Sequence, residues 1–146
     1  MYIGFKHLHS FLPYIFFILG LYLVVVSLIR WKSRNSYNKT DGLLRTIVLS
    51  LAHIQLLVGL VLYFISPITQ SAFADFGAAM KDSTLRLYAV EHISINILAI
   101  VLMTIGSSKA KKEIIEFKKH KLVFIYFGMG IVLILSRIPW HVWPNL

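Results

Sequence analysis

Four long apolar runs divide the chain, and polar or charged segments separate them. The runs cover residues 8–29, 47–65, 87–106 and 122–138. Each is long enough for a helix rising about 1.5 Å per residue to cross the hydrocarbon core of a bilayer, which is about 30 Å thick. The pattern predicts an all-α integral membrane protein. Because the connections are short, neighbouring helices should be antiparallel, and we expect a single transmembrane domain built as a four-helix up-down bundle.

The composition agrees with a membrane protein and changes how the charge is interpreted. The chain has 146 residues, of which 58% are hydrophobic and 14% are charged, and its net charge is +9. In a soluble protein this charge would suggest a nucleic-acid partner. Here the lysines and arginines lie in the connections between apolar runs, so membrane topology explains them and we expect the lipid bilayer, and no nucleic acid, as a partner.

The basic residues are distributed unevenly among the connections, and this predicts an orientation. Residues 30–46 contain five Lys and Arg residues and residues 107–121 contain six, whereas residues 66–86 contain two. Positively charged loops stay in the cytoplasm. We therefore expect the loops 30–46 and 107–121 to be cytoplasmic, both termini to be outside, and the membrane to be the bacterial inner membrane.

Several polar residues interrupt the apolar runs, where a polar side chain is costly unless it faces other helices or a cavity. Counting residues from the outer surface predicts two layers at different depths. The outer layer holds His9, Glu91, His92, Arg137 and His141. The central layer holds Gln55, Asn96 and His53.

These layers suggest a b-type haem held by two histidines from different helices. Helix bundles hold cofactors with inward-facing side chains, and imidazole is a common haem ligand. The chain has no cysteine, which excludes thiolate ligands and c-type attachment. His9 and His92 are the best matched in depth, about 6 to 9 Å apart along the membrane normal, so we expect them to ligate the iron. His53 and Arg137 are further candidate cofactor-binding residues.

Each of these residues also has a purely structural interpretation. His53 could donate a hydrogen bond to a neighbouring helix instead of binding a cofactor. Arg137 could form an ion pair with Glu91, or bind a propionate of the haem with its planar guanidinium group. His120 lies in a run of lysines, where we expect it to be solvated or near phospholipid headgroups.

Two other classes of function fit the same residues. His92 and Glu91 near the outer surface, with His53 deeper, could form part of a proton relay or a quinol site. Alternatively, the chain could be a non-catalytic accessory subunit of a larger membrane complex, in which polar side chains bind helices to one another. Pro13 gives a separate expectation for the first helix, which should begin close to His9 or Ser10 because proline is best tolerated in the first turn.

Short segments along nearly the whole chain resemble a family of small bacterial four-span proteins described as cytochrome-b-like. They include Ala52-His53-Ile54-Gln55, Val90-Glu91-His92 and Ile138-Pro139-Trp140. The resemblance implies the four-span architecture and a role for His9, His53, His92 and His120. From the histidine layers and the resemblance together, we expect bound haem b and electron transfer with quinone or a respiratory partner.

Overall fold

The computed structural model describes residues 1–144, and within this range every regular element is a helix. Four helices are long and apolar enough to cross a membrane. They are α1 (Tyr2–Lys32), α2 (Lys39–Ile65), α6 (His92–Lys112), which the preceding turns extend, and α7 (Glu116–Ser136). The predicted all-α class with four spanning helices is therefore confirmed.

A series of short helices connects α2 to α6. They are α3 (Pro67–Ala74), α4 (Phe76–Ala79), α5 (Ser83–Arg86) and the π-helix η1 (Leu87–Glu91). Pro67 occupies the first turn of α3, where its missing amide hydrogen leaves no helical bond unmade. The side chains of Asp75 and Asp82 accept hydrogen bonds from the first amides of α4 and α5, which supply the partners that those amides lack within the helix.

The long helices extend well beyond the apolar runs, so the connections between them are shorter than expected. α1 begins at Tyr2 and carries Pro13 inside it, and the prediction of a start near His9 or Ser10 is wrong. α2 begins with a reciprocal capping box in which the side chains of Asn38 and Asp41 each accept a hydrogen bond from the other's backbone amide. Such a box satisfies two amides that the first turn leaves free, and it starts the helix eight residues before Ile47, where the apolar run begins.

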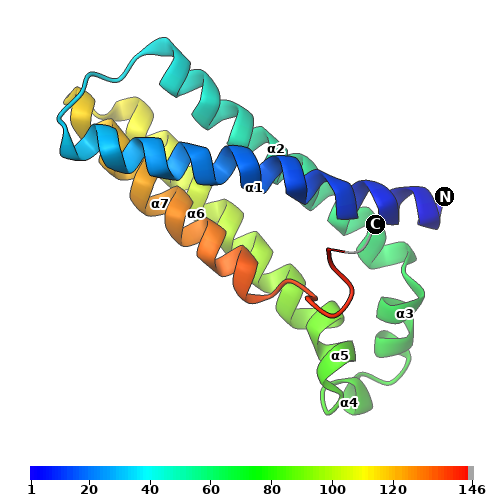
Figure 1. Ribbon diagram of the computed structural model, residues 1–146. Coiled ribbons are helices and arrows are strands. Elements are labelled where there is room, and N and C mark those ends of the chain that lie inside the picture. Colours follow the sequence, from blue (N-terminus) through cyan, green and yellow to red (C-terminus); the bar gives the residue numbers. More distant parts are fainter. Residues whose placement is uncertain (145–146) are drawn as a thin grey trace.

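The four long helices pack as a ring in which α1 contacts α2 and α7, and α6 contacts α2 and α7. Figure 1 shows the α1–α2 pair and the α6–α7 pair meeting at one end and diverging toward the other, where α3, α4 and α5 lie. We call the first the closed end and the second the open end. The N-terminus and the segment 137–144 that follows α7 both lie at the open end.

Side-chain packing explains why the closed end is tight. Residues from all four long helices form one buried cluster that includes Leu23, Val48, Met103 and Phe127. α6 and α7 approach closely because Gly106 lies directly against the Tyr126 side chain. Small residues allow such close approach between helices in a membrane.

Three side chains form a polar cluster at the closed end. Asp41 is buried and forms an ion pair with Arg30, and its second oxygen lies 3.9 Å from the Nε2 atom of His120. The His120 side chain is 1% exposed, so the prediction that it is solvated among the lysines is wrong. The ring packs on Tyr37, with 4.8 Å between ring centroids, because this face of α7 turns toward the α1–α2 connection. Burial raises the pKa of the Tyr37 phenol above its usual value, which keeps this group neutral.

Candidate functional site: a histidine-lined cavity at the open end

A cavity of about 680 Å³ lies at the open end between the diverging helix pairs. This volume is within the range of small-molecule sites, which is about 300 to 1,000 Å³. α1, α2, η1, α6, α7 and the segment 137–144 all contribute to its lining. Most of the wall is apolar, and the polar side chains that line it are His7, His9, Ser10, Gln55, Tyr63, Ser66, Thr69, Tyr88, His92, Asn96, His141, Trp143, Tyr2 and Lys6.

Two histidines from different helices meet in this cavity. His9 comes from α1 and His92 begins α6, and their ring centroids are 6.2 Å apart with an angle of 75° between the ring planes. A metal–nitrogen bond is about 2 Å long, so two imidazoles on opposite sides of one metal have centres about 6 Å apart. The spacing of this pair therefore suits two ligands of a single metal atom.

His92 is held in one tautomer by a backbone contact. Its Nδ1 atom lies 2.7 Å from the carbonyl oxygen of Arg137, just after α7. Because a carbonyl can only accept, Nδ1 carries the hydrogen, and the lone pair of the neutral ring is on Nε2. Histidine ligands of metals are commonly oriented by such a bond from the other ring nitrogen.

The π-helix η1 ends immediately before His92. A π-helical turn adds a residue to the normal helical turn and is frequent at functional sites. Here the π-helix rotates the side chains before His92 relative to those of α6. The Tyr63 hydroxyl, from α2, donates a hydrogen bond of 2.6 Å to the carbonyl of Ala89 within η1. This contact ties α2 to the segment that precedes the histidine.

His9 presents the opposite situation, since its Nδ1 atom is buried and has no hydrogen-bond partner in the protein. Buried polar atoms are nearly always paired, so this nitrogen lacks the partner that such an atom usually has. Gly59 on α2 makes room for the ring. A Cβ atom at this position would lie 2.9 Å from Cε1 of His9, which is too close for an undisturbed contact.

The backbone of His9 is fixed through Pro13. In an α-helix the carbonyl of His9 would accept from the amide of residue 13, but proline has no amide hydrogen. The Nε2 atom of Gln55 donates to this carbonyl at 2.8 Å instead. The Trp143 indole likewise donates to the carbonyl of Ser10 at 2.9 Å. The proline thus leaves the His9 carbonyl free to accept from Gln55, and this hydrogen bond links α1 to α2 at the level of the histidine pair.

Asn96 and Gln55 belong to the cavity wall, as part of the polar network predicted from their depth. Asn96 donates a hydrogen bond of 2.6 Å to the carbonyl of His92, one turn earlier. The Oε1 atom of Gln55 is buried without a hydrogen-bond partner. This oxygen and the Nδ1 atom of His9 are thus both buried in the wall without a hydrogen-bond partner in the protein.

Three other predicted site residues lie elsewhere. His53 is exposed on the outside of the bundle and does not line the cavity, and its nitrogens lie 2.8 Å from the Leu49 carbonyl and 3.4 Å from Oγ1 of Thr104 on α6. These contacts correspond to its structural interpretation. Glu91 forms ion pairs with Arg86 at 2.8 Å and with Arg137 at 3.3 Å. The Arg137 guanidinium group is thus directed to Glu91, outside the cavity lining, and only its carbonyl serves the site.

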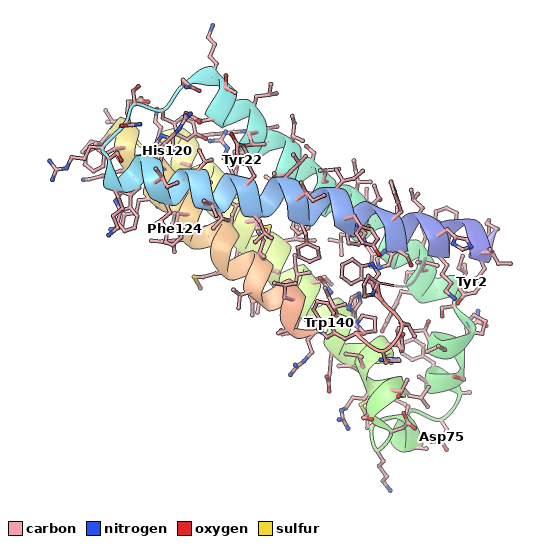
Figure 2. The ribbon with its side chains drawn as sticks, viewed as in Figure 1. Tyr2, Tyr22, Asp75, His120, Phe124 and Trp140 are labelled. Atoms are coloured by element: carbon pink, nitrogen blue, oxygen red, sulfur yellow. The ribbon has the colours of Figure 1, made fainter. Side chains whose placement is uncertain are left out.

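The structure adds lining residues after α7, of which the sequence pattern had singled out only His141, as part of the outer polar layer. His141 and Trp143 follow α7, and the ring of His141 packs edge-on against Tyr88 with 6.1 Å between centroids. Figure 2 shows Trp140 of this segment beside the open end, far from His120 at the closed end. Pro139 follows the last apolar run, and the apolar pattern gave no indication that the chain folds back over the cavity after this proline. The signal available in the sequence was the density of aromatic residues after that proline.

The donor set fits a haem better than a metal ion bound by side chains alone. Within residues 1–144 no group of three or more His, Asp or Glu residues could hold a metal ion. A haem needs only two protein ligands on the axis of its ring, and the porphyrin supplies the others. The two imidazoles from different helices and the mostly apolar wall meet this requirement.

Comparison with protein-family models, with curated proteins and with solved structures found no match for this chain. The resemblance to cytochrome-b-like proteins therefore stays a prediction, and the functional argument depends on the geometry of the cavity.

Proposed function

We propose that the protein is a haem b-binding membrane protein that transfers electrons to or from a quinone or a respiratory partner. The observation that carries this proposal is the histidine pair, with 6.2 Å between the His9 and His92 rings at a cavity of about 680 Å³. Bound haem would supply one-electron redox chemistry.

The chain's own residues would orient the ligands and exclude water. The Arg137 carbonyl keeps the lone pair of His92 on Nε2, and Gly59 leaves space for the His9 ring. Gln55 holds the helix at His9 through its backbone. Apolar side chains such as Phe16, which is 4% exposed, would help to exclude water from the inner part of the cavity, where a low dielectric disfavours charge on buried groups.

The test is the visible spectrum of the protein purified in mild detergent and loaded with haem. We expect a Soret band and a reduced-minus-oxidised difference typical of two histidine ligands. His92→Ala and His9→Ala should each abolish that signature. His53→Ala is the matched control, because His53 lies outside the cavity, and it should leave the spectrum unchanged.

A loaded wild-type protein without a Soret band would contradict the proposal. The alternative function, a non-catalytic accessory subunit of a larger membrane complex, would then be favoured. Equal loss of the signal in His53→Ala and His92→Ala would also count against this site, since it would indicate a general effect on folding.

We further propose that the protein lies in the bacterial inner membrane with the closed end in the cytoplasm and the open end outside. The support is the excess of lysine and arginine in the connections at the closed end, because positively charged loops stay in the cytoplasm. Because the chain has no cysteine, single cysteines can report the orientation. Ser71→Cys should react with a membrane-impermeant reagent added to intact spheroplasts, and Ser36→Cys should not; the reverse pattern would invert the proposed orientation.

A further inference from the structure

The cavity lining is unbalanced in charge. Its titratable side chains other than tyrosine are Lys6, His7, His9, His92 and His141, and none of the described lining residues is Asp or Glu. An anionic group in the cavity would therefore meet basic side chains without competition from a carboxylate in the described wall.

The nearest acidic residue along the chain is already neutralised. Glu91 precedes His92, but its carboxylate lies between Arg86 and Arg137, at 2.8 and 3.3 Å. No described carboxylate forms an ion pair with Lys6. The basic character of the lining is thus not cancelled by the surrounding residues of 1–144.

These basic residues are concentrated on the outward side of the histidine pair. Lys6 is three residues before His9 on α1, so the two share a helix face, with Lys6 about 4.5 Å nearer the N-terminus. On the other wall, His141 packs against Tyr88, which precedes His92 by four residues. Tyr2, at the start of α1, lies at this end of the molecule (Figure 2) and also lines the cavity.

On the inward side of the pair, the lining is mainly apolar apart from the amide side chains of Gln55 and Asn96. It includes Phe16, Ala52, Ile100 and Ile134, and the first three are buried in the main core. The cavity therefore has a basic mouth and an apolar floor, with the two imidazoles between them.

We propose that the mouth of the cavity is a carboxylate-binding subsite, in which Lys6 and His141 bind the acid groups of a flat, mostly apolar ligand that inserts its apolar edge first. This inference rests on the proposed function and specifies it further: for haem b, the two propionates would lie at the mouth. Lysine is well suited to this position because its ammonium group can remain hydrated at the membrane surface while it attracts the carboxylates.

The test separates carboxylate recognition from iron ligation by using porphyrins without a metal. Metal-free protoporphyrin, which has two propionates, and its dimethyl ester are titrated separately into the full-length protein in non-ionic detergent. Binding is followed by the shift of the porphyrin absorption bands. We expect the diacid to bind about tenfold more tightly than the diester, as one charge-assisted contact predicts.

Lys6→Gln should remove most of this preference, and His141→Gln should reduce it. Lys81→Gln is the matched control, because Lys81 is an exposed lysine in the α3–α5 region that does not line the cavity, and it should retain the preference. Comparing diacid with diester in the same variant cancels any general effect of the substitution on folding or on detergent partitioning.

Each outcome has a distinct meaning. No preference for the diacid in the wild type, no binding of either porphyrin, or a preference that survives Lys6→Gln would overturn the carboxylate subsite. If iron haem gave a two-histidine Soret band while the diacid preference was absent, only this inference would fail. If the preference were present and dependent on Lys6 but haem gave no such band, the ligation by His9 and His92 would fail and the subsite would stand.

Discussion

Each end of the bundle contains a histidine with a buried ring nitrogen, and the two histidines differ in what surrounds them. At the closed end, His120 is 1% exposed, and its Nε2 atom lies 3.3 Å from the Ser36 carbonyl and 3.9 Å from Asp41. At the open end, His9 has a buried Nδ1 atom without a partner and lines a cavity. Burial alone therefore does not indicate function. The informative combination is a buried nitrogen left unpaired beside open space.

Glycines show the same difference between the ends. Gly106 on α6 and Gly130 on α7 admit the side chains of Tyr126 and Met103 from the opposite helix, so they bring the two helices together. Gly59 on α2 instead admits the ring of His9, the residue that lines the cavity. One property, the absence of a Cβ atom, thus serves helix packing in one region and the position of a candidate ligand in the other.

Removal of the buried imidazole at the closed end should have the largest effect on stability. His120→Ala leaves a cavity in a fully packed region and removes a neighbour of buried Asp41, so we expect a loss of about 2 to 4 kcal/mol in the free energy of unfolding. Unfolding by titration with a denaturing detergent measures this loss. The haem spectrum of the folded fraction should be unchanged.

His9→Ala should give the opposite result, a lost haem spectrum with a smaller change in stability. If His120→Ala abolished the spectrum while stability was retained, His120 would be the cofactor ligand. The assignment of a functional histidine to the open end and a structural one to the closed end would then be wrong.

Alanine substitutions at the glycines should have the next largest effect. At Gly106 the new Cβ atom would lie 2.1 Å from Cβ of Tyr126, close to the backbone of α7, so the helices must separate and we expect a cost of about 1 to 3 kcal/mol. At Gly59 the clash is with the end of a side chain that can rotate away. Gly59→Ala should therefore cost less stability but displace His9, and it should weaken haem binding.

Gly128→Ala is the control for both substitutions. Its Cβ atom would meet only Val24, at 3.8 Å, which is an ordinary contact, so stability and haem binding should both be retained. Unaltered haem affinity in Gly59→Ala would indicate that the His9 ring is not held in the position described.

The sequence predicted the four spanning helices because apolar length is a local property that a bilayer makes decisive. It also predicted that His9 and His92 lie at a similar depth, since helical rise converts residue number into distance. It did not predict which way a side chain turns around its helix. His53 and Gln55 both have apolar neighbours in the sequence, yet His53 lies outside the bundle, while Gln55 lines the cavity.

Two other features depended on contacts between segments distant in the sequence. The burial of His120 follows from its packing against the α1–α2 connection, more than 80 residues earlier, and its lysine-rich neighbours gave no sign of it. The π-helix before His92 and the return of the segment 137–144 over the cavity have no periodicity of their own. They arise from tertiary contacts such as those of Tyr63 with Ala89 and Trp143 with Ser10.

The hydrogen bond from Gln55 to the His9 carbonyl, which Pro13 leaves without a helical donor, should contribute least to stability of the features considered. Its contribution can nevertheless be tested directly. Gln55→Leu removes the donor to the His9 carbonyl, and Pro13 supplies no amide to replace it. We expect a loss of about 1 kcal/mol in the free energy of unfolding, the typical contribution of one hydrogen bond.

Pro13→Ala restores an amide that can donate to the same carbonyl, so the two substitutions should not be additive. In the Pro13→Ala background, Gln55→Leu should cost clearly less than in the wild type, because the carbonyl keeps a partner when the glutamine is lost. The double-mutant cycle measures this difference directly. Equal costs in the two backgrounds would show that Gln55 stabilises the open end through packing and not by replacing the hydrogen bond that proline removes.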